Sequence, residues 1–79
     1  MKDEELVEII KDNTKEYIDF NTEDVEVIDN TIIINNFEKY NNIDEDLLSE
    51  IISDILIDIF DRYVYVNVYN SKLIIDIEK

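Results

Sequence analysis

The alternation of apolar and polar side chains predicts two helices, of which the second is the more regular. Over residues 43–63, isoleucine and leucine recur every three or four positions, which is the period of an amphipathic helix. Residues 3–20 show the same period, and Asp3 is a candidate N-cap for that helix. The predicted core-facing positions are Leu6, Ile9, Ile10, Asn13, Tyr17 and Phe20 in the first helix, and Leu48, Ile51, Ile52, Ile55 and Ile59 in the second.

Four short stretches rich in β-branched residues predict strands. Val25–Ile28 and residues 31–37 flank the dipeptide Asp29-Asn30, which is typical of a hairpin turn. Residues 64–68 alternate in polarity, and residues 73–77 follow after a second polar turn. The predicted order of elements is therefore αββαββ. The simplest assembly is an α+β fold, a four-stranded, mostly antiparallel sheet with both helices on one face.

The αββ order occurs twice, which suggests an internal repeat. A shift of 42 positions places Leu6 on Leu48, and a shift of 41 places Val25 on Val66. A chance alignment of two isoleucine-rich αββ stretches is the alternative explanation, and it stays open here. We expect one small acidic domain over residues 1–79, with possible repeat units 3–37 and 43–78.

The net charge of the chain gives the first indication of what kind of partner it binds. Among 79 residues, 21 are acidic and 7 are basic, which gives a formal charge of −14. This charge opposes binding to nucleic acid or to an anionic membrane, because both require clustered lysine and arginine. It attracts basic protein surfaces, above all those that bind nucleic acid. Since the chain also lacks the apolar run of a signal peptide, we expect a cytoplasmic protein.

Catalytic chemistry has little support in the residue types. Histidine, cysteine and glycine are absent, which removes the usual nucleophile–base pairs, thiolate metal sites and phosphate-binding loops. Residues 42–46 begin like a calcium loop, but Leu47 stands where that loop needs glycine and Ser53 where it needs glutamate. We therefore expect no enzyme activity, no metal and no cofactor.

Carboxylates occupy the outward side of both predicted helices at one-turn spacing, which is about 6 Å along the axis. Like charges so placed oppose folding by about 0.2–0.5 kcal/mol per pair, a cost that a partner would explain. A solvated face is the competing explanation, because the outer faces of helices are ordinarily charged. The candidate partner-binding residues are Glu8, Asp12, Glu16 and Asp19 in the first helix, and Glu50, Asp54, Asp58 and Asp61 in the second.

The alternation in the third strand gives a second candidate surface. If its valines face the helices, its tyrosines lie on the open face of the sheet. Aromatic patches of this kind are typical of interfaces, whereas cross-strand packing alone is the alternative. A homodimer contact is one use of such a face. The predicted open-face residues are Tyr63, Tyr65, Tyr69, Ile33 and Ile74, joined by Ile28 and Phe37.

In charge and size the chain is similar to small acidic proteins of phages and plasmids that block nucleases, among them anti-CRISPR proteins, anti-restriction proteins and uracil-glycosylase inhibitors. Each DNA strand carries a charge every ~3.4 Å, and two acidic rows imitate that spacing coarsely. The resemblance implies an inhibitor that mimics DNA and blocks the nucleic-acid-binding surface of a defence nuclease complex. Two alternatives stay open: an antitoxin or immunity protein that neutralises a basic nuclease toxin, and a non-enzymatic structural or regulatory dimer.

Overall fold

A computed structural model of the chain describes residues 2–40 and 44–78. The predicted order αββαββ is confirmed, with two short 3₁₀ helices (η) added before the first strand and after the second. The elements are α1 (Asp3–Thr14), η1 (Thr22–Asp24), β1 (Val25–Ile28), β2 (Thr31–Ile34), η2 (Phe37–Lys39), α2 (Glu45–Phe60), β3 (Val64–Tyr69) and β4 (Lys72–Ile77).

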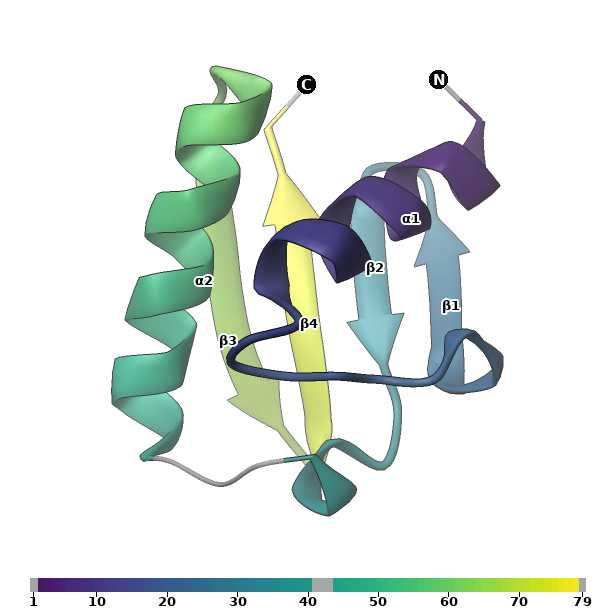
Figure 1. The fold of residues 1–79 in the computed structure, drawn as a ribbon, viewed down its shortest axis with the longest axis vertical. Coiled ribbons are helices and arrows are strands. Elements are labelled where there is room, and N and C mark those ends of the chain that lie inside the picture. The colour runs from purple at the N-terminus through teal and green to yellow at the C-terminus, as the bar shows by residue number, and fades with distance from the viewer. Residues whose placement is uncertain (1, 41–43, 79) are drawn as a thin grey trace.

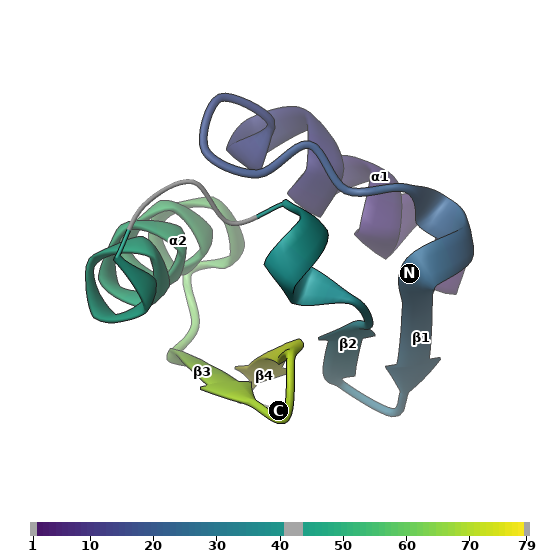
Figure 2. The same ribbon diagram turned by 90° about the horizontal axis from the view of Figure 1, so that it is seen from below.

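The four strands form one sheet in the order β1-β2-β4-β3, and every neighbouring pair is antiparallel. Both helices and η2 lie on one face of this sheet, and the opposite face carries no described element (Figures 1 and 2). The predicted α+β architecture is therefore confirmed. The second strand of each hairpin lies in the centre, so the order is symmetric, although the internal repeat itself stays a prediction.

The tight turns form without glycine. Asp29 between β1 and β2, and Asn70 and Ser71 between β3 and β4, take left-handed backbone angles with φ from 50° to 60°. Short polar side chains reach this conformation more readily than other non-glycine residues. The two hairpins therefore close tightly in a chain that contains no glycine.

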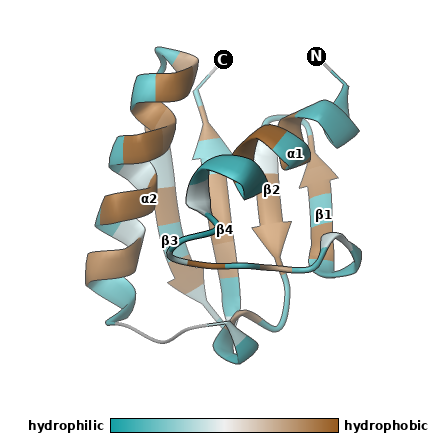
Figure 3. Ribbon diagram, in the orientation of Figure 1, coloured by the Kyte–Doolittle hydropathy of each residue, from teal (hydrophilic) through white to brown (hydrophobic). Residues whose placement is uncertain are grey.

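The core lies between the sheet and the helices. Alternate positions of the strands face it, and the strands are predominantly hydrophobic whereas turns and helix ends are hydrophilic (Figure 3). Burial of these side chains supplies the main driving force for folding. The core consists of Val7, Ile10, Ile18, Phe20, Ile32, Ile34, Phe37, Leu48, Ile52, Leu56, Val64, Leu73, Ile75 and Ile77.

The first helix is shorter than the predicted 3–20, because it ends at Thr14. The side chains of Asn13 and Thr14 bond back to helix carbonyls at 2.7 Å, a pattern that competes with continuation of the helix. Beyond the turn, Ile18 and Phe20 become fully buried, while Tyr17 stays exposed. The predicted core positions Asn13 and Tyr17 are therefore wrong. The helix begins at Asp3 itself, so Asp3 is not its N-cap.

The second helix is also shorter than predicted. It spans Glu45–Phe60, and the side chain of Asp44 caps it by accepting the backbone N–H groups of Asp46 and Leu47 at 3.0 and 3.2 Å. Predicted position Ile43 lies outside the described residues. The predicted core position Ile59 is wrong, since its side chain remains 38% exposed. The fully buried side chains of α2 are Leu48, Ile52 and Leu56.

Phe37 is not on the open face of the sheet, contrary to the prediction. β2 ends at Ile34, and Asn36 takes a left-handed conformation with φ 55° that turns the chain toward the helices. Phe37 then lies in the core with 1% of its surface exposed. Its backbone N–H donates to the carbonyl of Ser71 at 2.7 Å, which holds η2 against the β3–β4 turn. The strand alternation therefore does not extend to this residue.

Candidate functional site

The outer side of α2 carries an exposed line of carboxylates. Glu50, Asp54 and Asp58 are each one helical turn apart, and all three side chains are exposed. The opposite side of the helix is buried against the sheet, so the helix cannot rotate to hide these groups. Together with Asp61 at the end of the helix they form what we call the α2 row.

The α2 row has no compensating positive charge within its helix. Residues 45–60 contain neither lysine nor arginine. Among residues 2–40 and 44–78, the ion pairs are Lys11 with Asp19 at 3.4 Å and Lys39 with Asp24 at 3.2 Å. Neither pair includes a member of the α2 row, and Arg62, the basic residue next to the row in sequence, forms no ion pair with it among these residues.

The end of α2 adds a second unfavourable feature. Asp61 is the C-cap and takes a left-handed conformation with φ 53°, which ends the helix and which aspartate reaches more readily than most residues other than glycine. Its carboxylate, and that of Asp58 one turn earlier, lie at the end of the helix where the backbone dipole disfavours negative charge. The negative charge of neither side chain therefore stabilises the helix.

The acidic side of the first helix is shorter than the sequence indicated. Glu8 and Asp12 lie on α1 and are exposed. Glu16 and Asp19 are also exposed, but they follow the end of the helix at Thr14 and do not continue its spacing. Asp19 is in addition paired with Lys11, whose Nζ also donates to the carbonyl of Phe20.

The two acidic helices do not lie parallel. α1 crosses the sheet obliquely while α2 follows the direction of the strands (Figure 1). The eight predicted carboxylates are thus all at the surface, but they do not form two lines in step. The structure brings one regular line together, the α2 row, with Glu8 and Asp12 on a separate helix of the same layer (Figure 2).

The predicted aromatic surface lies where the alternation placed it. Tyr63, Tyr65 and Tyr69 are 56%, 55% and 66% exposed, and the rings of Tyr63 and Tyr65 lie 4.7 Å apart. Ile33 and Ile74 pair across β2 and β4 and are half-buried. Polar residues share this face, since the hydroxyl of Thr31 donates to Asp76 at 3.3 Å across the same strand pair.

Asp24 lies at the centre of a partly exposed hydrogen-bonded cluster that the sequence did not indicate. Its carboxylate accepts hydrogen bonds from the Tyr40 hydroxyl and, at 3.1 Å, from the Asn36 amide, and Lys39 lies 3.2 Å away. The Tyr40 hydrogen bond, followed by that of Asn36, lowers the pKa of Asp24, and the bond to Asp24 raises the pKa of Lys39. The cluster joins η1 to η2 over 12–16 residues of sequence, a separation for which local pattern gives no signal.

Comparison with known proteins adds no relative: no family model matches the chain, and no curated protein or solved structure matches it. In the part of the chain that the structure describes, no three metal-ligating side chains gather into a possible ion site. No helix in that part has the length and apolar character needed to cross a membrane. The charge and shape of the chain's own surface are therefore what indicate its function.

Proposed function

We propose that this protein is a phage- or plasmid-encoded inhibitor of a defence nuclease complex, of the anti-CRISPR or anti-restriction type, acting in the host cytoplasm. It uses the α2 row to occupy the basic surface on which that complex binds DNA. The observation that carries the proposal is the α2 row itself, an exposed line of carboxylates along a packed helix, with no ion pair to any residue in 2–40 or 44–78.

The spacing of the row suits a surface built for phosphates. A step of four residues along a helix is about 6 Å, close to the ~6.8 Å between every second phosphate of one DNA strand along its axis. Arginine and lysine side chains that bind every second phosphate could therefore contact the carboxylates of the row, whose spacing along the axis is similar. Because the partner also feels the whole charge of −14, long-range attraction speeds the encounter.

The cost of the α2 row to folding stability also supports a role in binding. The pairs Glu50–Asp54 and Asp54–Asp58 each oppose folding by about 0.2–0.5 kcal/mol, and Asp58 and Asp61 also oppose the helix dipole. A small domain has a net stability of only about 5–15 kcal/mol. Binding to a basic partner converts this repulsion into attraction, which supplies a reason for the row.

The proposal is tested by reversing the row. The variant Glu50→Lys/Asp54→Lys/Asp58→Lys and the wild type are immobilised, and proteins from a host lysate are captured at low salt. The wild type should retain a nucleic-acid-binding complex that is released by duplex DNA and by 1 M salt, where the Debye length falls to ~3 Å. The variant should fail to capture it, and only the wild type should inhibit the DNA cleavage of the captured nuclease.

A matched control separates position from total charge. Glu26→Lys/Asp76→Lys/Glu78→Lys changes the net charge by the same amount, but these exposed residues lie on or beside the open face of the sheet. This control should still capture and inhibit. Equal capture by the α2 variant and the wild type would contradict the proposal. Release of a small nuclease toxin instead of a defence complex would favour the antitoxin alternative, which uses the same electrostatics.

The exposed tyrosines favour a second candidate, a homodimer through the open face. Tyr63, Tyr65 and Tyr69 are each more than half exposed, and solvent-exposed aromatic groups are typical of interfaces. Sedimentation of the wild type beside Tyr65→Ala/Tyr69→Ala tests it. A wild-type dimer that the double substitution converts to monomer supports the candidate, and a monomeric wild type at ~0.1 mM excludes a stable dimer.

A further inference from the structure

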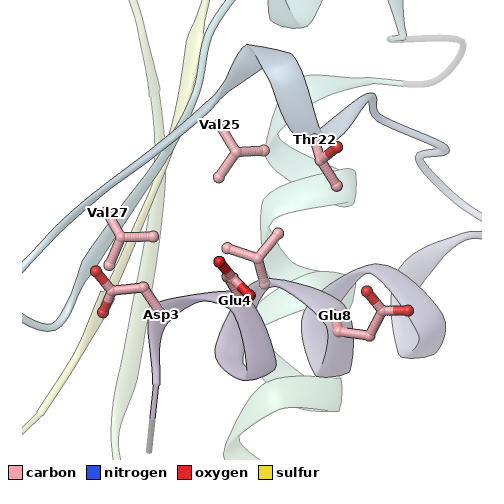
Figure 4. A pocket seen from close by; sticks show the side chains of 7 residues that line it. Asp3, Glu4, Glu8, Thr22, Val25 and Val27 are labelled. Carbon is pink, nitrogen blue, oxygen red and sulfur yellow. The ribbon is translucent and has the colours of Figure 1, made fainter.

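A groove separates α1 from the first strand, on the side of the molecule away from α2. Its floor is apolar: Val7 comes from α1, and Val25 and Val27 from β1 (Figure 4). The groove has a volume of about 470 Å³. Val25 and Val27 are only half-buried there, although they lie on the core side of the sheet. The described residues therefore leave part of the apolar surface of Val25 and Val27 exposed to solvent.

The strand beside the groove is an edge strand. β1 pairs with β2 alone, and no described strand lies beyond it (Figure 1). The N–H of Asn35 donates to the carbonyl of Asp24 at 2.7 Å, and bonded positions alternate along an antiparallel pair. The backbone groups of Glu26 and Ile28 therefore face β2, whereas those of Val25 and Val27 face outward.

Only part of this outward edge is used within the chain. The N–H of Val25 donates to the carbonyl of Thr22 and so closes η1. The N–H and carbonyl of Val27 both point outward, and one residue of an added antiparallel strand would bond to both. An edge of this kind selects a peptide over a small cation, because only a peptide offers the matching N–H and carbonyl groups.

The rim of the groove defines the chemistry of that peptide. Asp3, Glu4 and Glu8 of α1 line it opposite β1 (Figure 4), and none of the described residues that line it is a lysine or an arginine. A strand added to β1 would direct every second side chain over Val25 and Val27 toward these carboxylates. Lysine and arginine fit both features, because their aliphatic stems cover apolar surface while their charged ends reach the acids.

We propose that the groove between α1 and β1 binds an extended segment of a partner protein that carries lysine or arginine at alternate positions, added as a fifth strand to the edge of β1. The site lies on a different surface from the α2 row and does not depend on which complex that row contacts. A basic partner held at both surfaces would be bound by a folded patch and by an extended arm.

The probe is a synthetic hexapeptide that alternates lysine and threonine, blocked at both ends and added to the ¹⁵N-labelled protein at low salt. Chemical-shift changes should concentrate in β1 and the first two turns of α1, and exchange of the Val27 amide should slow. N-methylation of the peptide's lysine amides removes the donors to the outward carbonyls of Val25 and Val27. The loss of these two hydrogen bonds should weaken binding about tenfold.

Two variants of equal charge locate the site. Glu4→Gln/Glu8→Gln should weaken the alternating peptide about fivefold, as expected for two exposed ion pairs, whereas Glu50→Gln/Asp54→Asn should change its affinity less than twofold. Equal binding of the N-methylated peptide, or of a peptide with its lysines in one block, would overturn the inference in favour of charge attraction alone. If the lysate capture experiment contradicted the role of the α2 row, the peptide titration would still test the groove. The two proposals can therefore be refuted independently.

Discussion

Neutralising the middle of the α2 row should make the protein more stable. The variant Asp54→Asn/Asp58→Asn removes the like-charge pair of Asp54 with Glu50 and the pair between Asp54 and Asp58, which is about 0.4–1.0 kcal/mol in all. Asp58 also lies in the last turn of the helix, where loss of a negative charge contributes about 0.3–1 kcal/mol. Asparagine and aspartate have similar helix propensity, so the change acts through charge. The expected gain is about 0.7–2 kcal/mol.

The assay is urea denaturation followed by far-UV circular dichroism, with a thermal scan beside it. At low salt the urea concentration at the unfolding midpoint should rise, while the dependence of the unfolding free energy on urea concentration should stay unchanged. The melting temperature should rise by about 4–8 °C for each kcal/mol gained. In 1 M salt the gain should largely disappear, because charges this exposed are screened at that ionic strength.

A control of equal charge uses the other end of the same helix. Glu45 and Asp46 lie in its first turn, where the dipole favours carboxylates. Glu45→Gln/Asp46→Asn should therefore gain nothing or lose stability, although it relieves the same overall charge. If both variants were stabilised equally, the total charge and not the position in the helix would be responsible. A destabilised Asp54→Asn/Asp58→Asn variant would refute the reasoning about the row altogether.

Two further predictions test the interior and the Asp24 cluster. Phe37→Ala should lower the free energy of unfolding by about 3–5 kcal/mol, because the ring is 1% exposed in the core; a urea titration that shows a loss below about 1 kcal/mol would contradict this position. The hydrogen bonds from Tyr40 and Asn36 hold the pKa of Asp24 below its unfolded value of about 3.9. The Asp24 carboxylate therefore stabilises the fold fully above pH ~3.9, and this stabilisation is lost as the pH falls through the folded pKa. The stability difference between wild type and Asp24→Asn should therefore shrink from about pH 6 to pH 2, and a difference independent of pH would exclude the role.

Much of the fold could be predicted because the local pattern and the global packing agree. The strand Val25–Ile28 has the bounds that its β-branched run indicated, and β3 and β4 differ from their predicted bounds by a single residue each. The direction of the side chains in β3 followed from a period of two, which put the tyrosines on one side. Helix period likewise placed Glu50, Asp54 and Asp58 on the exposed side of α2.

The errors occur where distant residues decide the local conformation. A helix continued past Thr14 would have buried Tyr17; the chain instead turns and buries Ile18 and Phe20, whose removal from water contributes about 1.5–3 kcal/mol each. Phe37 was misplaced for the same reason, because the left-handed Asn36 breaks the strand and the core takes the ring. In both places burial against other elements outweighs local propensity.

Residue types and periods of two or 3.6 were enough to predict the charge, the order of elements, the acidic side of α2 and the tyrosine side of β3. The folded chain alone shows that α1 lies oblique to α2, that Glu16 and Asp19 lie beyond the end of the helix, and that Val25 and Val27 face Glu4 and Glu8 across a groove. The reason is physical. Periodicity describes one element at a time, whereas helix direction and groove shape are set by how the side chains of several elements fill one core.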